Sequence, residues 1–184
     1  GVPNYVAYPN TDWQNVLFGH GIINDHSVSV SGGTDKLRFL MSAGYLDNPG
    51  LVDKTGIKKY TLRMNVEADI IQWMTIGTRT FASQKDKEAG NFSNANSYLS
   101  STTPGVYPEW NGEYGFPEAP EELATANNIL RFLNASDGHE QETHFNTTLY
   151  SRISPIKGLS WDFNLNYTRR WDDDANWTVP LGRI

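Results

Sequence analysis

The sequence has no cysteine, no long apolar run and no excess of basic residues. Among its 184 residues, 15 are Lys or Arg and 21 are Asp or Glu, so the formal net charge is −6. The absence of cysteine excludes disulfides, thiolate metal sites and a cysteine nucleophile. The acidic balance argues against nucleic acid as a partner, which requires a basic surface. No segment is long and apolar enough for a transmembrane helix, whereas alternating membrane strands are compatible with the mean hydropathy of −0.53.

The chain is instead rich in aromatic residues (12%) and contains 16 glycines, a composition that favours an all-β fold. One segment, residues 120–133, has helical character and begins with Pro and two acidic residues, so we expect one short helix there, inside a loop. The chain does not begin with Met, and nothing at its start resembles a signal peptide. We therefore expect it to be an internal piece of a longer protein.

Six stretches alternate between apolar and polar residues, with the period of two that is typical of a strand with one apolar face. The clearest covers residues 60–70, in which the even-numbered residues are apolar and the odd-numbered ones are polar. The other stretches cover residues 27–31, 37–45, 74–79, 145–153 and 160–168.

The connections between these stretches alternate in length. Those at residues 32–35, 71–73 and 155–159 are short, whereas those at 47–56 and about 85–142 are long. In an antiparallel meander all the short turns then lie at one end of the sheet, as is typical of outer-membrane barrels. A structureless loop of the longer kind is unusual in a compact soluble domain. Because alternation alone also fits a soluble sandwich, we keep a soluble β-sandwich carbohydrate-binding module as the alternative.

The spacing of two tryptophans supports the membrane interpretation. Trp161 and Trp171 lie on the same face of the last predicted strand, ten residues apart. At about 3.3 Å per residue and a tilt of about 40°, this spacing covers about 25 Å along the membrane normal. That distance matches the apolar band between the two aromatic girdles of an outer-membrane barrel.

Several motifs follow one another in the order found in one protein family. As a set they cover most of residues 10–83 and 143–170, and they resemble the start of the barrel in SusC/RagA-like TonB-dependent outer-membrane transporters. The motifs are residues 10–13 (NTDW), 26–36 (HSVSVSGGTDK), 42–46 (SAGYL), 50–52 (GLV), 60–66 (YTLRMNV) and 155–159 (PIKGL).

The resemblance implies an all-β chain whose antiparallel meander forms part of a large transmembrane β-barrel of about 22 strands, in the outer membrane of Bacteroidetes-like bacteria. Residues 1–23 would link an N-terminal plug to the barrel. Residues 24–184 would contribute its first strands, with a long extracellular loop at about 85–142. Six strands are too few to close a barrel of that size. The open edges of such a sheet would be unpaired in lipid.

The resemblance also implies partners. The family imports oligosaccharides or peptides, together with a SusD-like surface lipoprotein that lids the barrel and with TonB, which supplies energy. TonB would act through a plug region that is absent from this chain, and outer-membrane lipid would surround the barrel. We expect no enzyme, no catalytic residues and no cofactor, because the sequence contains no nucleophile elbow, phosphate loop or rigid carboxylate pair.

The best candidate for ligand contact lies at residues 103–116, a stretch of the long loop rich in Gly, Pro and aromatic residues. Tyr107, Trp110 and Tyr114 could stack on sugar rings while neighbouring Asn and Glu side chains bind hydroxyls. The same aromatic side chains could instead pack the loop against itself or contact a lid protein.

Two further groups of residues are candidates for a metal site and for the lumen wall. His139 and His144 lack the spacing of a zinc signature, and the acidic run at residues 172–174 lacks the ligand order of an EF-hand, so we expect no metal site. Five charged residues of the polar faces would point into the barrel lumen as structural wall, paired with one another or in contact with a plug. They are Arg38, Arg63, Glu67, Asp69 and Arg79.

Overall fold

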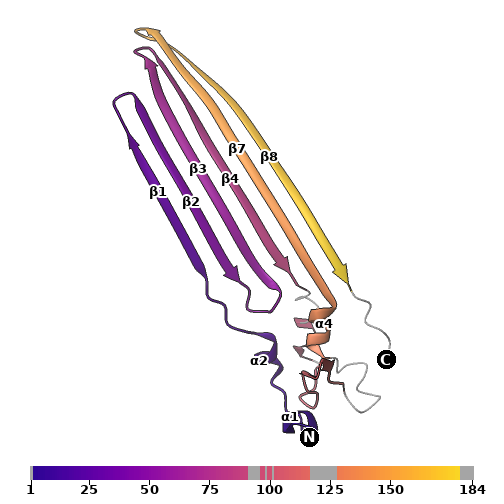
Figure 1. Cartoon of the computed structure of the whole chain (residues 1–184). Helices are drawn as coiled ribbons and strands as arrows, with labels where there is room; N and C mark the ends of the chain where they lie inside the picture. The colour runs from indigo at the N-terminus through magenta and orange to yellow at the C-terminus, as the bar shows by residue number, and fades with distance from the viewer. Residues whose placement is uncertain (1, 91–95, 98, 101, 117–127, 179–184) are drawn as a thin grey trace.

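The computed structural model describes residues 2–90, 96–97, 99–100, 102–116 and 128–178. Six long antiparallel strands form one sheet in the order β1-β2-β3-β4-β7-β8, so the all-β meander predicted from the sequence is confirmed (Figure 1). The strands are β1 (Asn24–Gly33), β2 (Leu37–Pro49), β3 (Thr55–Ile71), β4 (Met74–Ala89), β7 (Ser136–Ile156) and β8 (Leu159–Thr178).

The register of the sheet brings the predicted apolar faces of all six strands onto one side. Side chains alternate across a strand, so residues that face each other in neighbouring strands lie on the same side of the sheet. One row of facing residues crosses the apolar side, and another crosses the polar side. The apolar row is Val30, Met41, Met64, Thr80, Thr147 and Tyr167, and the polar row is Ser29, Ser42, Arg63, Phe81, Asn146 and Thr168.

Three threonines interrupt the apolar side near its middle. Their hydroxyl groups pair with one another, Thr80 with Thr147 at 2.8 Å and Thr78 with Thr80 at 3.3 Å. Because a hydroxyl is costly to remove from water only when it lacks a partner, these residues are compatible with an apolar environment.

The predicted asymmetry of the connections is confirmed. Residues 34–36, 72–73 and 157–158 connect strands at one end of the sheet, whereas residues 50–54 and 90–135 connect them at the other (Figure 1). We call these the short-turn end and the long-loop end.

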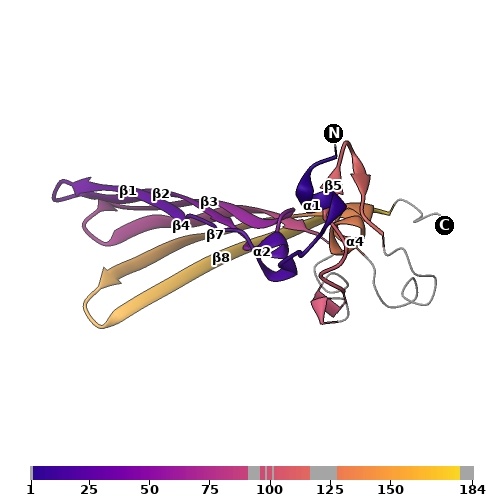
Figure 2. The same cartoon turned by 90° about the horizontal axis from the view of Figure 1, so that it is seen from below.

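The sheet is a single layer, seen nearly edge-on in Figure 2. The only other sheet among the described residues is the small one formed by β5 (Glu109–Trp110) and β6 (Glu113–Tyr114). The apolar side therefore stays open, with Phe163 59% and Leu165 67% exposed. A sandwich would bury these side chains against a second sheet, so the β-sandwich alternative is wrong.

Strands β4 and β7 run further toward the long loop than the alternation predicts. The sequence placed the loop at about residues 85–142, but β4 continues to Ala89 and β7 begins at Ser136. Polar pairs hold this extension together, among them the ammonium group of Lys87, 2.9 Å from Glu140. Because both faces of the extension are polar, no period-two signal marks it.

The buried core of the described residues lies at the long-loop end, where short helices gather (Figure 2). These helices are α1 (Asn4–Ala7), α2 (Trp13–Leu17) and α4 (Ile129–Ala135). No helix among the described residues is long and apolar enough to cross a membrane. We call the buried cluster the cap core, and it consists of Trp13, Leu17, Val52, Val106, Ile129 and Leu133.

The short helix predicted at residues 120–133 is present in its second half, as α4. It begins later than predicted, after Asn128, and continues two residues further, to Ala135. Residues 120–127 of the prediction lie outside the described residues.

Candidate functional site

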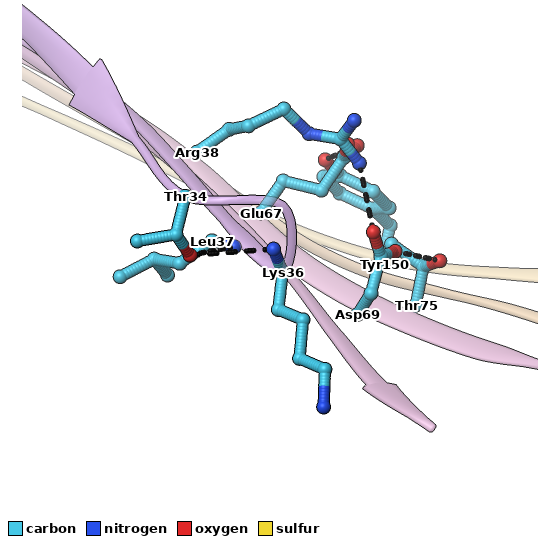
Figure 3. Close-up of polar contacts among 8 residues, drawn as sticks. All are labelled: Thr34, Lys36, Leu37, Arg38, Glu67, Asp69, Thr75 and Tyr150. Atoms are coloured by element: carbon cyan, nitrogen blue, oxygen red, sulfur yellow. Dashed lines mark hydrogen bonds and ion pairs between the residues drawn. The ribbon is translucent and has the colours of Figure 1, made fainter. Parts of the chain in front are cut away.

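The polar side of the sheet carries a charged cluster beside the short turns (Figure 3). The guanidinium of Arg38 lies 2.7 Å from Glu67 and 3.2 Å from Asp69, so the pairing expected for these three residues is confirmed. The Thr75 hydroxyl donates to Asp69 at 2.6 Å, and the Tyr150 hydroxyl donates to Glu67 at 2.7 Å. The cluster ties strands β2, β3, β4 and β7 together. Each ion pair contributes only about 0–1 kcal/mol, because its members are partly exposed.

Tyr150 reaches Glu67 because the residue between them is a glycine. Gly77 of β4 faces Glu67 on one side and Tyr150 on the other. A Cβ atom at Gly77 would overlap the Tyr150 ring. Glycine thus leaves room for the ring to cross β4, a role that the sequence pattern did not reveal.

A second charged cluster lies on the same side of the sheet at the long-loop end. Glu142 of β7 pairs with Lys85 of β4 and lies 3.7 Å from Arg170 of β8, which also pairs with Asp172 at 2.9 Å. Glu142 faces Asp172, one rung beyond Trp171. The hydrogen bond from Lys85, followed by the charge of Arg170, holds the pKa of the Glu142 carboxyl below its usual value. This carboxylate therefore stays ionised at neutral pH.

Two arginines lie between these clusters and stack on aromatic rings. The guanidinium of Arg63 lies 5.8 Å from the centre of the Phe81 ring, and that of Arg79 lies 4.7 Å from the centre of the Tyr150 ring. The edge of the His144 ring meets Phe81, with 6.0 Å between the centres. Within the described residues neither arginine forms an ion pair, so the pairing with other wall residues that was expected of them is not observed.

The three aromatic residues singled out as ligand contacts lie at the long-loop end, each half-buried. In the β5–β6 hairpin Trp110 faces Glu113, and Glu109 faces Tyr114. Because neighbouring rungs point to opposite sides, Trp110 and Tyr114 lie on opposite faces of the hairpin. Tyr107 precedes the hairpin. The structure thus does not bring the three rings together into one stacking platform.

A buried asparagine fixes this hairpin to α4. Asn128 is fully buried, and its side-chain amide donates to the carbonyls of Tyr107 at 3.1 Å, Pro108 at 2.6 Å and Gly115 at 3.2 Å. Its side-chain oxygen accepts from the Leu130 N–H at 3.0 Å and so caps α4. Asn128 was not among the predicted site residues, although an Asn before an apolar helical stretch is a helix-start signal.

The N-terminal NTDW motif also contacts the long loop. Asp12 caps α2, and the indole N–H of Trp13 donates to the Thr103 carbonyl at 2.9 Å. The Thr11 hydroxyl donates to the Val106 carbonyl at 2.6 Å. These bonds join segments that lie about 90 residues apart in the chain.

The residues weighed for metal binding do not converge. Asp172 and Asp174 lie on one side of β8 and Asp173 on the other, as their facing residues in β7 show. His139 and His144 likewise lie on opposite sides of β7. Across the described ranges, no three His, Asp or Glu side chains are grouped as metal ligands.

Comparison with known proteins gives a consistent result. No protein-family model matches the chain. In sequence it is 30% identical over 112 residues to "TonB-dependent receptor P26" of Formosa agariphila, which covers 61% of this chain and 11% of that protein. It is 34% identical over 65 residues to "TonB-dependent receptor SusC" of Bacteroides thetaiotaomicron, which covers 35% of this chain and 6% of that protein. The chain thus spans about a tenth of the length of these relatives.

A solved structure has the same fold. The chain superposes on "Structure of the RagAB peptide importer in the 'open-open' state" with a TM-score of 0.73 and 18% identity, over 97% of this chain and 21% of that chain. The relatives in sequence, together with this fold, confirm the family resemblance predicted from the ordered motifs. The names of these relatives describe receptors and an importer, and none describes an enzyme.

Proposed function

Because the chain is SusC/RagA-like in sequence and in fold, we propose that it forms part of the wall of a TonB-dependent nutrient importer in the bacterial outer membrane. The observation that carries this proposal is the one-sided sheet. Its apolar face is open, its other face holds paired charges, and its short and long connections are segregated to opposite ends. These are the features of a wall between lipid and a wet lumen.

The apolar face has the height that a membrane requires. Trp161 lies near the start of β8 and Trp171 lies ten positions further along, both on this face, and Tyr60 packs on Tyr45 with 5.2 Å between the ring centres. The spacing of ten residues from one tryptophan to the other covers about 25 Å along the membrane normal. Aromatic residues at both limits of an apolar band favour the two interfaces of a bilayer.

The sheet would close into a barrel only with further strands. Both edge strands, β1 and β8, are exposed along their whole length. In lipid, unpaired N–H and C=O groups along such edges would cost several kcal/mol each. We therefore place this sheet within a barrel of about 22 strands, where residues 24–184 supply neighbouring strands and the long-loop end faces outward.

The proposed partners follow from the family. A SusD-like surface lipoprotein would cover the long-loop end, and TonB would supply energy through a plug region. Oligosaccharides or peptides would be the imported solutes, and the similar RagAB structure is that of a peptide importer. Residues 1–23 would connect the plug with this sheet, and the contacts of the NTDW motif with the long loop would fix that connection at the outer end.

We place the first contact with the solute or the lid protein at the β5–β6 hairpin. Trp110 is half-buried beside the exposed Glu113, and Tyr114 lies on the opposite face with Glu109. Each face thus offers one ring and one carboxylate, which suits sugar hydroxyls or peptide amides. Tyr107, whose carbonyl accepts from Asn128, holds the base of the hairpin.

Growth of the native bacterium tests this function. Deleting the gene should abolish or slow growth on one class of oligosaccharide or oligopeptide supplied as sole carbon source, and the wild-type gene should restore it. The Trp110→Ala variant should restore growth only in part. Tyr8→Ala changes an aromatic residue that is 82% exposed outside the hairpin, and it should restore growth fully. Unchanged growth of the deletion strain on every such source would contradict the proposal.

A further inference from the structure

Two arginines in the middle of the polar side lack the carboxylate partners that five other strand cations there possess, and Lys59 beside Lys85 likewise has none among the described residues. Strand residues Arg38, Lys85, Lys87, Arg152 and Arg170 each lie within 4 Å of a carboxylate on this side. Arg63 and Arg79 are exposed there and have no carboxylate partner among the described residues. The nearby Glu67 pairs with Arg38 and accepts a hydrogen bond from Tyr150 instead.

The register places these two arginines next to each other. Arg63 of β3 faces Phe81 of β4, and Arg79 lies two residues before Phe81 on the same strand. Such diagonal neighbours are about 7–8 Å apart. Both guanidinium groups carry positive charge on the same side of the sheet, and an anion that both contact would offset the repulsion between them.

The aromatic rings fix the orientation of both guanidinium groups. A guanidinium that lies over a ring can still direct N–H groups of its edge to a further partner. Phe81 supports Arg63, and Tyr150, itself bonded to Glu67, supports Arg79. On the β2 side Arg63 faces only Ser42, whose small side chain leaves space above the sheet.

We propose that Arg63 and Arg79 together bind a carboxylate on the polar side of the sheet. A planar carboxylate matches the forked edge of a guanidinium, and two such edges can hold it from two directions. The carboxylate comes either from an acidic side chain of the protein's own polypeptide or from an acidic solute that passes along this side. The second source rests on the proposed function, whereas the first does not.

Chemical modification of arginine tests the site in the complete, detergent-purified protein. Phenylglyoxal reacts with free guanidinium groups, and mass spectrometry of peptides measures the rate at Arg63 and Arg79. The probe is a tri-glutamate peptide, with tri-glutamine as its neutral counterpart. If a solute fills the site, both arginines react readily at rest, and tri-glutamate at about ten times its dissociation constant slows the reaction about tenfold, whereas tri-glutamine does not.

The other source gives a different result. If an acidic side chain of the protein fills the site, both arginines are protected at rest, and 1 M salt, which screens exposed ion pairs, restores their reaction. Modification rates that respond neither to tri-glutamate nor to salt would overturn the proposal. The readout does not depend on import, so its failure would leave the proposed function standing.

A matched control uses a third stacked arginine on the opposite side of the sheet. Arg169 lies 4.7 Å from the centre of the Trp171 ring, on the apolar side. Arg63→Gln should abolish the protection of Arg79, because the carboxylate then loses half of its site. Arg169→Gln should leave that protection unchanged. Equal protection of Arg79 in the two variants would overturn the proposal.

Discussion

Single residues without charge decide how the polar clusters and the cap are built. Gly77 admits the Tyr150 ring across β4, and Asn128 uses all of its amide donors and its oxygen to join the hairpin to α4. Neither position is marked by the alternating pattern, because their partners lie far away in the sequence. By contrast, the pairing of Arg38 with Glu67 and Asp69 could be anticipated, because the strand pattern already placed all three on the polar side.

Replacing Gly77 with alanine should destabilise the protein. The added methyl group overlaps the Tyr150 ring, which must move and release its hydrogen bond to Glu67. We expect a loss of about 1–3 kcal/mol in the free energy of unfolding, as for other overpacked sites. Denaturant unfolding of the complete protein in detergent measures it. Gly56→Ala is the control, because a Cβ there meets only ordinary contacts of 3.4 Å or more. Equal stability of the two variants would refute this explanation.

Replacing Asn128 with aspartate should free the hairpin while keeping the helix cap. The carboxylate still accepts from the Leu130 N–H, but it cannot donate to the carbonyls of Tyr107, Pro108 and Gly115. Leaving those carbonyls without the amide costs about 1–3 kcal/mol. Hydrogen exchange at residues 107–115 should therefore become faster. Glu113→Gln at the exposed hairpin should not change it, and unaltered exchange in the aspartate variant would contradict the role of Asn128.

The strands show which elements a sequence can reveal. Where one face is apolar, as at residues 60–70 of β3, alternation identified both the strand and its face. Where both faces are polar, as at the outer parts of β4 and β7, cross-strand ion pairs hold the strands together. The apolar–polar alternation ends before these strands do. The cap core was equally hidden, since Trp13, Val106 and Ile129 come from separate segments. The resemblance of the NTDW motif to the SusC/RagA-like family drew attention to the segment that contains Trp13, but it did not indicate what this segment contacts.

The polar extension of β4 and β7 should depend on its cross-strand charges. Lys87→Glu places two carboxylates opposite each other at the Glu140 rung, so the ends of both strands should fray. Hydrogen exchange of residues 86–89 should accelerate by an amount that corresponds to about 0.2–1 kcal/mol. The double variant with Glu140→Lys restores opposite charges and should reverse the change. Exchange that is fast in both variants would show that charge does not hold the extension.

At the scale of the whole molecule, the two sides of the sheet differ in chemistry, one being charged and the other apolar. All seven ion pairs among the described residues lie on one side of the sheet, and the open apolar residues of the strands, apart from Leu40, lie on the other. The cap core occupies one end and leaves both sides of the strands uncovered (Figure 2). A single sheet with these two faces suits the boundary between two different solvents, such as the bilayer and the wet lumen of the proposed function.

Neighbouring positions of one strand therefore give the most direct test of the account. Single cysteines at Leu165 and Asn166 of β8, and at Leu62 and Thr61 of β3, would carry a fluorescent label in the complete protein, reconstituted in lipid vesicles and free of other cysteines. We predict that brominated lipid quenches the labels at Leu165 and Leu62, and that aqueous iodide quenches those at Asn166 and Thr61. If all four labels responded equally to either quencher, the sheet would not separate lipid from lumen, and the proposed transporter wall would be wrong.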